Sequence, residues 1–329
     1  MSAIEVVGIG SAWVDRVYHC SERYLKSVGL EPGRIYKVGS ERYRSLCQGR
    51  TDVFQYAGGS VANSLVALSQ LSHQVGFVGK ASVDGDGLFF MNDLMSHGVS
   101  MRLPPSDEDL STSGCLFFHS GAGSVTKVVH LGASKTLGLA DMSMQDVIDA
   151  RVLLVEADIL DMPKLHEWLA SVLDLAKKNK TQIVLVLSNK YVVSRHRTFL
   201  LDLLCIVDFV AGNEIEFETL LNTQAIENIQ SYFSHLPLIG IMTRSSEGSC
   251  VFSSDEFFCV HSHGCQLIDT VAAGDYYLSG FLHAYLNGLG LQQSADLGSV
   301  LASKVCSQRG SRCCDMEDLT EIASSFMAV

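Results

Sequence analysis

Short apolar runs alternate with longer amphipathic stretches through the C-terminal half of the chain. The runs predict buried strands near residues 152–155, 183–187, 207–211 and 238–242, and the stretches predict helices near 163–178, 194–204 and 214–221. Strands that alternate with helices form parallel sheets covered by helices on both faces. We therefore predict an α/β fold with a mostly parallel sheet.

The rest of the chain is less regular. The pattern predicts strands near 4–9 and 75–78, a helix that begins at Ser60, a helix near 88–95, hairpins near 115–131 and 251–260, and closing helices near 274–287, 292–308 and 316–327. Residues 16–56 differ, because they are polar, rich in Arg and Tyr, and without a helical period. We interpret that stretch as an excursion from the core.

Composition narrows the classes of function. Of 329 residues, 47% are apolar and 18% are charged, which is enough to fill a large core. The net charge of -12 and the lack of a Lys/Arg run argue against a nucleic-acid-binding face. We expect no membrane span, because no apolar run approaches about 20 residues, and no signal peptide. We predict a cytoplasmic protein whose ten cysteines, which lack zinc-site spacing, are reduced and mostly buried.

The most informative segment is Asp269-Thr270-Val271-Ala272-Ala273-Gly274-Asp275, at the start of the predicted helix 274–287. The first amides of a helix lack internal partners, and small side chains let an anion approach them. Asp275 lies at the same place, where a carboxylate beside an anion site can accept a hydroxyl proton. Alternatively, Asp275 only caps the helix and the small residues only allow close packing. Spacing alone supports both interpretations equally.

Two further segments carry polar residues where open α/β sheets bind ligands. Asp15 follows the first predicted strand, and Asn63 follows the glycine pair Gly58-Gly59. Asparagine offers a donor and an acceptor to a substrate hydroxyl, and glycine lets the backbone come close to a ligand. The plain alternatives are an ordinary loop carboxylate for Asp15 and an exposed polar residue for Asn63.

Asn213 and Glu216 follow the predicted strand 207–211 and lie on one side of a helix start. They suit a hydrated Mg²⁺ with nucleotide phosphates, and they suit a plain helix cap equally well. The chain contains no G-x-x-x-x-G-K-[ST] motif, no protein-kinase loop and no G-x-S-x-G elbow. These absences argue against a P-loop enzyme, a protein kinase and an α/β-hydrolase.

Together these segments resemble the ribokinase-like (PfkB) carbohydrate kinase family, most closely its bacterial adenosine-kinase-like branch. The resemblance runs nearly from end to end. Besides Asp15, it rests on G-G-S-V-A-N-S at 58–64, V-G-K-x-x-x-D-x-D-G at 78–87, L-G-A-S at 131–134, S-R-H-R at 194–197, N-E-I-E at 213–216, T-R-S-S-E-G at 243–248 and D-T-V-A-A-G-D at 269–275.

The resemblance implies a three-layer α/β/α core, Rossmann-like, with a small β-sheet lid. It places residues 1–15, 51–111 and 132–329 in the core, and 16–50 and 112–131 in a lid over the substrate site. It also implies an ATP-dependent kinase that transfers the γ-phosphoryl group to a primary hydroxyl of a nucleoside or sugar, with an adenosine-like acceptor favoured. The alternatives are a kinase of a free sugar such as ribose or fructose, and a weakly active nucleoside-binding sensor.

The resemblance also assigns roles to residues. Asp275 is expected to take the hydroxyl proton, and the backbone of Ala272, Ala273 and Gly274 is expected to form the anion hole. The other expected sites are Asp15, Gly58, Gly59 and Asn63 for the substrate, Asn213, Thr243, Ser245 and Gly248 for ATP, and Glu216 for Mg²⁺ through water. Some members bind a monovalent cation such as K⁺ near the carbonyls of Asp269 and Val271.

This sequence departs from the family pattern at Ala272 and Ser245, where the family has glycine. A methyl group at residue 272 narrows the anion hole, and a positive φ there would be strained by about 1–2 kcal/mol. Such strain would slow phosphoryl transfer without abolishing it.

The choice of acceptor depends on the lid. A purine needs apolar or aromatic surfaces, for which Trp13, Phe117 and residues around Val128 are candidates. A phosphorylated sugar needs cations, for which Arg16, Arg42 and Lys127 are candidates. The plain alternative is that the apolar and aromatic candidates only pack in the core or lid and that the charged ones are only solvated surface residues. Lid strands pair between subunits in several family members, so the resemblance is compatible with a homodimer.

Overall fold

The computed structural model describes residues 4–50, 54–106, 110–121, 125–313 and 316–327. A nine-stranded central sheet has the order β14 (Phe257–Val260), β13 (Ser249–Phe252), β12 (Ile239–Thr243), β11 (Phe209–Asn213), β10 (Gln182–Val186), β9 (Val152–Glu156), β1 (Val6–Ile9), β5 (Val75–Val78) and β6 (Ser100–Met101). The strands from β12 to β6 are parallel, and β13 and β14 add an antiparallel edge.

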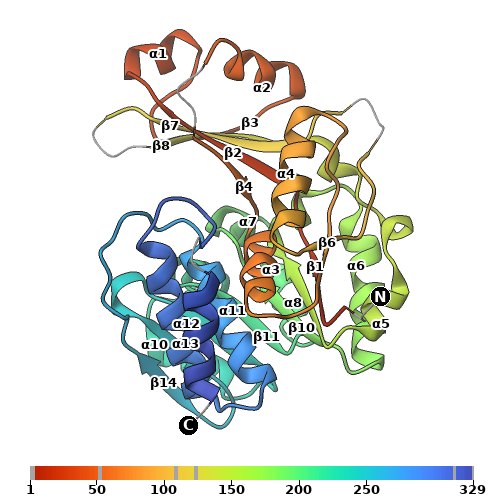
Figure 1. The fold of residues 1–329 in the computed structure, drawn as a ribbon, viewed down its shortest axis with the longest axis vertical. Coiled ribbons are helices and arrows are strands. Elements are labelled where there is room, and N and C mark those ends of the chain that lie inside the picture. The colour runs from red at the N-terminus through yellow and green to blue at the C-terminus, as the bar shows by residue number, and fades with distance from the viewer. Residues whose placement is uncertain (1–3, 51–53, 107–109, 122–124, 314–315, 328–329) are drawn as a thin grey trace.

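Helices cover both faces of this sheet (Figure 1). One face carries α5 (Met144–Asp149), α6 (Leu165–Lys178), α7 (Lys190–Arg195), α8 (Arg197–Leu203), α9 (Glu214–Leu221) and α10 (Ile226–Phe233). The other face carries α3 (Ser60–Gln70), α4 (Gly85–Ser96), α11 (Ala273–Leu286) and α12 (Leu291–Cys306), with α13 (Met316–Met327) packed outside them. The predicted three-layer α/β/α fold is confirmed.

Apolar side chains on both faces of the strands produce this arrangement. Val152 to Val155 of β9 alternate between two apolar clusters, one on each side of the sheet, and are at most 2% exposed. A strand that is buried on both sides has a continuous run of apolar residues, which explains why these strands could be predicted from the sequence.

A second, five-stranded sheet lies at the top of the view in Figure 1. Its order is β3 (Ile35–Lys37), β8 (Val125–His130), β7 (Ser113–His119), β2 (Trp13–His19) and β4 (Phe54–Gly58). Strand β2 begins at Trp13, before the expected lid boundary at residue 16, and β4 lies wholly within residues 51–111, which were assigned to the core. The predicted hairpin is present as β7 and β8, although residues 122–124 of its turn lie outside the described residues.

Two short helices, α1 (Glu22–Ser27) and α2 (Ser40–Cys47), cover the outer face of the second sheet. The sequence did not predict them, because these short segments are mostly polar and show no clear apolar period. The predicted helix 194–204 is instead two helices that meet at His196. The described part of the chain also contains the 3₁₀ segments η1 (Gly132–Thr136), η2 (Leu139–Asp141), η3 (Ala157–Asp161) and η4 (Ser245–Glu247).

The prediction about cysteines is wrong for one pair. Cys250 and Cys259 lie directly opposite each other on β13 and β14 and form a disulfide. Their spacing in the sequence did not reveal that a hairpin would bring them together. The free thiols of Cys205 and Cys265 are also exposed rather than buried.

Within the described residues, no helix has the length and apolar character needed to cross a bilayer.

Candidate active site

A cleft of about 500 Å³ lies between the inner face of the second sheet and the carboxyl ends of the central strands. Open α/β sheets bind ligands at this edge. The second sheet contributes Trp13, Asp15, Cys115, Phe117 and Lys127, and the core contributes Gly59, Asn63, Glu156, Asp158, Asn213 and Glu216. The cleft therefore combines residues from segments that are far apart in the sequence.

A second cavity, of about 280 Å³, adjoins the cleft. Thr243, Ser245, Gly274 and Asp275 line this cavity and not the larger one, while Ser60, Ser188, Asn213 and Glu216 line both. Two adjoining cavities with a shared wall suit a reaction between two bound molecules.

Asp275 lies in the first turn of α11, and its Oδ2 accepts a hydrogen bond from Asn63 Nδ2 at 2.7 Å. Burial raises the pKa of Asp275 to about 6, while hydrogen bonds from Asn63 and Ser60 and the charge of Arg312 act in the opposite direction. A carboxylate with a pKa near the working pH is suited to take a proton and later release it.

The backbone before Asp275 is arranged around one left-handed residue. Ala272 has φ +62° and ψ +8°, and the Ala273 amide donates to the Thr270 carbonyl at 3.3 Å. The Ala273 amide is therefore engaged and does not fit the expected anion hole of Ala272, Ala273 and Gly274. Within the described residues, the amides of Gly274 and Asp275 have no acceptor. A Cβ at Gly274 would meet nothing within 4 Å, so an anion has open access to these amides.

Asp15 and the glycine pair lie close together. A Cβ at Gly58 would come within 2.2 Å of Asp15 Oδ2, and a Cβ at Gly59 within 2.9 Å of the Ser11 carbonyl. Gly59 also has φ +96°, so glycine is needed at both positions. Burial raises the pKa of Asp15 to about 7, against the opposing charge of Lys127. Gly58 itself does not line the cleft and acts by making room for Asp15.

Asn213 and Glu216 form the capping box that was the plain alternative. The backbone amide of Asn213 donates to Glu216 Oε2 at 2.9 Å, and the side-chain Nδ2 of Asn213 donates to Glu216 Oε1 at 2.8 Å. In return, the backbone amide of Glu216 donates to Asn213 Oδ1 at 3.0 Å. Burial raises the pKa of Glu216 to about 7. Both carboxylate oxygens are thus already engaged, which fits contact with Mg²⁺ through water better than direct ligation. The described residues contain no cluster of three or more His, Cys, Asp or Glu that is arranged to hold a metal.

Four residues are expected to contact ATP, and they lie in different positions. Asn213 lines both cavities. Thr243 and Ser245 line the smaller cavity. Gly248 lines neither cavity, and it has φ +94° with a Cβ position only 1.9 Å from the Val260 carbonyl. Gly248 therefore forms the tight turn into β13, which accounts for its glycine without a nucleotide contact.

At the expected K⁺ site, the segment 268–271 is hydrogen-bonded to Gly310 and to Cys306, the last residue of α12. The Asp269 carboxylate accepts from the amides of Val271 at 3.2 Å and Gly310 at 3.1 Å. The Cys306 carbonyl accepts from the amides of Ile268 and Asp269. These contacts hold two loops together, and they single out no carbonyl for a cation.

Sequence reasoning missed two acids in the cleft, Glu156 and Asp158. Glu156 ends β9, is 1% exposed, and accepts from the amides of Ser11 and Ser60 at 3.0 Å each. Burial and the nearby Asp158 raise its pKa, and burial also raises the pKa of Asp158. The signal was available, because Glu156 directly follows the predicted strand 152–155, at the sheet edge where open α/β sheets bind ligands.

The candidates for acceptor recognition separate into two groups. Trp13, Phe117 and Lys127 line the cleft, with the Lys127 ammonium 5.1 Å from the centre of the Phe117 ring. Val129, next to Val128, also lines it, and the other named candidates do not. Val128 is buried on the outer face of the second sheet, Arg16 pairs with Asp86 on α4, and Arg42 donates to the Val28 carbonyl.

Known proteins are similar to this chain over most of its length. The family model described as "pfkB family carbohydrate kinase" matches residues 40–318, most of the chain. The chain is 26% identical over 268 residues to the 5-dehydro-2-deoxygluconokinase of Bacillus licheniformis, covering 78% of this chain and 82% of that protein. It is 27% identical over 271 residues to the enzyme of the same name from Shouchella clausii, with 78% and 82% coverage.

Solved structures share the fold of this chain. The adenosine kinase of Sinorhizobium meliloti and a probable sugar kinase from Rhizobium etli CFN 42 each superimpose with a TM-score of 0.88, at 26% identity, over 100% of both chains. The match spans both sheets, and the resemblance inferred from the sequence is confirmed. The chain belongs to the pfkB family of carbohydrate kinases, and it is a phosphotransferase that uses an alcohol group as acceptor.

Proposed function

We propose that the chain transfers the γ-phosphoryl group of ATP to a primary hydroxyl of a nucleoside or sugar, with Asp275 as the base. The observation that carries this proposal is the position of Asp275. It lies beside open amides at the start of α11, where the acceptor cleft and the smaller cavity adjoin.

Asp275 accepts the proton of the acceptor hydroxyl as the O–H bond breaks. The hydroxyl oxygen then forms its bond to the γ-phosphorus, and the bond from that phosphorus to the β,γ-bridging oxygen breaks and leaves ADP. The amides of Gly274 and Asp275 stabilise the negative charge of the moving group. Phosphoryl transfer requires mainly positioning and electrostatic stabilisation, which these groups supply.

The remaining site residues support binding in this proposal. Asp15 and Asn63 hold acceptor hydroxyls, and Gly59 allows the acceptor to lie close to the backbone.

Thr243 and Ser245 line the nucleotide cavity. Asn213 and Glu216 orient water around Mg²⁺, which neutralises phosphate charge when bound. The second sheet, with its inner face on the cleft, acts as a lid that excludes water.

The acceptor is proposed to be adenosine-like. Trp13 and Phe117 offer aromatic surfaces in the cleft, and the adenosine kinase of Sinorhizobium meliloti aligns over 100% of the chain. A sugar acceptor is the alternative, because relatives at 26% identity phosphorylate 5-dehydro-2-deoxygluconate by name and Lys127 offers the cleft a cation.

A coupled ADP-release assay separates these acceptors. The panel contains adenosine, inosine, ribose, fructose, fructose phosphates and 5-dehydro-2-deoxygluconate. Adenosine should give the highest kcat/KM, and a higher value for an anionic sugar would overturn the adenosine proposal while leaving the kinase intact.

A weakly active nucleoside sensor is the second candidate function. The observation that favours it is Ala272, a non-glycine residue held at φ +62° beside the open amides. No ADP release across the panel, together with tight adenosine binding by calorimetry, would establish the sensor.

The cellular setting of the protein is also proposed. We place it in the cytoplasm, and we propose a homodimer formed through an edge strand, β3 or β4, of the second sheet. Light scattering measures the mass, and a monomer at micromolar concentration would contradict the dimer.

A further inference from the structure

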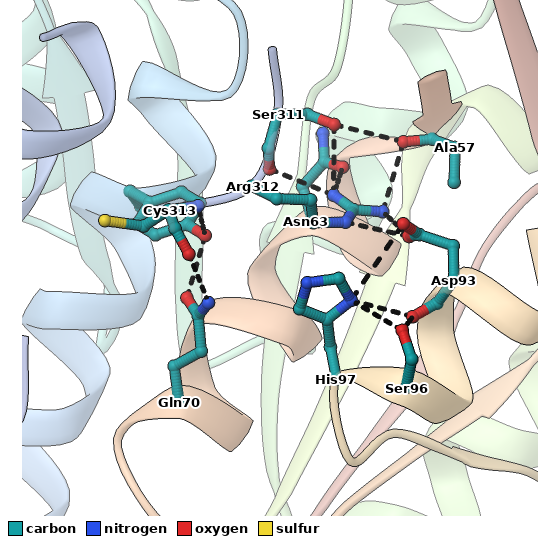
Figure 2. A network of polar contacts seen from close by, with 10 residues as sticks. Ala57, Asn63, Gln70, Asp93, Ser96, His97, Ser311, Arg312 and Cys313 are labelled. Carbon is teal, nitrogen blue, oxygen red and sulfur yellow. Dashed lines mark hydrogen bonds and ion pairs between the residues drawn. The ribbon is translucent and has the colours of Figure 1, made fainter. Parts of the chain in front are cut away.

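Arg312 joins three elements beside the proposed active site (Figure 2). Its Nη1 donates to Asn63 Oδ1 on α3 at 2.5 Å. Its Nε and Nη2 contact Asp93 Oδ2 on α4 at 2.9 and 2.8 Å. Nη2 also donates to the Ala57 carbonyl of β4 at 3.1 Å. The side chain is only 13% exposed, so these contacts are shielded from water.

The segment that carries Arg312 is itself anchored to α11. The Tyr276 hydroxyl accepts from the Cys313 amide and donates to Gln70 Oε1, each at 2.8 Å. Gln70 Nε2 in turn donates to the Cys313 carbonyl at 2.8 Å. Because Tyr276 directly follows Asp275, the same helical turn holds both the carboxylate and the segment of Arg312.

The contacts of Arg312 decide which way the Asn63 amide points. A guanidinium has only donors, so it must face the oxygen of the amide. Asn63 Nδ2 is then directed toward Asp275 Oδ2, to which it donates at 2.7 Å. A flipped amide would place its oxygen against a carboxylate, where neither group can donate, and its nitrogen against the guanidinium.

We propose that Arg312 is a positioning residue for the phosphoryl transfer: by fixing the Asn63 amide, it holds the Asp275 carboxylate in place and in its ionised form. The inference rests on the proposed function of Asp275. Arg312 touches neither cavity, so it acts through Asn63. Its positive charge adds to the same effect, because it lowers the pKa of Asp275.

The test compares Arg312→Met with Arg312→Lys and with the control Arg102→Met. Arg102 forms a similar two-point ion pair with Asp146, at 2.7 and 2.8 Å, outside both cavities. Arg312→Met should lower kcat by about 10²-fold with little change in KM for ATP, because a displaced base loses reactivity. Its acidic limb of kcat/KM should move to higher pH, because Asp275 loses the nearby charge of Arg312 and the Asn63 amide that donates to it is no longer held in place. Arg102→Met should leave both unchanged.

Arg312→Lys tests the geometry and serves if Arg312→Met fails to fold. Lysine keeps the charge but lacks the fork that reaches Asn63 and Asp93 together, so its kcat should lie between the wild type and Arg312→Met. In an Asn63→Leu background, Arg312→Met should have little further effect. Wild-type kcat and pH profile in a folded Arg312 variant, or full additivity with Asn63→Leu, would overturn the proposal.

A ¹³C NMR titration of the Asp275 carboxyl separates this inference from the proposed function. Its pKa should rise in Arg312→Met whether or not the wild type phosphorylates any acceptor. An unchanged pKa of Asp275 would overturn the positioning role of Arg312, even if the chain is an active kinase. A shift in Arg312→Met that the charge-preserving Arg312→Lys does not restore, in a chain that is silent across the acceptor panel, would support the positioning role of Arg312 and reject the proposed function.

Discussion

Asn63 Nδ2 donates to Asp275 Oδ2 at 2.7 Å and bridges α3 and α11 across 212 residues of sequence. One end of this bond lies on a helix that begins at the glycine pair, and the other lies on the helix that begins after Ala272. The two segments that looked most informative in the sequence therefore meet in a single contact. That contact holds the proposed base in place and favours its ionised form, against the effect of burial.

Replacing Asp275 by asparagine removes the base and keeps the shape. We expect turnover to fall by about 10²–10⁴, with ATP and acceptor binding largely retained. Steady-state kinetics and calorimetry measure the two effects. Asp255→Asn, at an exposed position between β13 and β14, is the control and should behave as wild type. Near-normal turnover of Asp275→Asn would reject Asp275 as the base.

The pH profile should report the Asp275 carboxyl. Its pKa of about 6 predicts that kcat/KM falls as the pH drops through 6, because the protonated carboxyl cannot accept the hydroxyl proton. Asn63→Leu removes a donor from the carboxylate, so its acidic limb should move to higher pH. The pKa values of Asp15 and Glu216, about 7, predict a second limb that Asn63→Leu leaves in place. An unmoved first limb would contradict the assignment.

Ala272→Gly should relieve backbone strain. Alanine at φ +62° costs about 1–2 kcal/mol, partly offset by the greater freedom of glycine in the unfolded chain. We expect a small rise in Tm and a rise in turnover. Lys164→Gly is the matched control, because Lys164 occupies the corresponding position of α6 at φ +62° and ψ +5° and lines neither cavity. A similar gain in turnover in both variants would show that the anion site is not involved.

Gly248→Ala should destabilise the protein strongly. Its Cβ would lie 1.9 Å from the Val260 carbonyl at a backbone conformation that suits glycine. We expect the free energy of unfolding to fall by about 2–4 kcal/mol. Gly288 has a similar φ of +88° but open space around the Cβ position, so Gly288→Ala should cost only about 1 kcal/mol. Denaturant unfolding compares them, and equal losses would refute the steric explanation.

His283 should make stability dependent on pH. Burial and then His73 lower the pKa of His283 to about 4, and His73 contacts Glu5, which also pairs with Arg151. The unfolded histidine titrates near about 6.5, so the unfolded chain binds the proton more readily. The contribution of His283 is therefore present above pH 6.5 and lost as the pH falls toward 4.

Unfolding of the wild type and of His283→Gln at pH 7 and pH 5 measures this effect. The variant should lose less stability than the wild type between the two values. His261→Gln, at an exposed position, is the control and should match the wild type. A variant with the same pH dependence as the wild type would exclude His283 as the cause.

Particular elements show how far the sequence alone was informative. Strand β5 and helix α9 match their predicted ranges, because apolar runs buried on both faces and clear N-caps are local signals. Helices α1 and α2, the break at His196 and the Cys250–Cys259 disulfide were missed. They depend on short segments or on pairing with a neighbouring strand.

The sequence by itself determined the periodicity of the elements, the small residues before Asp275 and, through its motifs, the family. Only the tertiary structure decided which polar groups face one another. It placed Glu156 beneath the amides of Ser11 and Ser60, and the Arg312 guanidinium against the Asn63 oxygen. The physical reason is that helix and strand signals arise within a few residues of chain. Parallel crossovers, in contrast, bring the carboxyl ends of distant strands together, and only that arrangement decides which side chains touch.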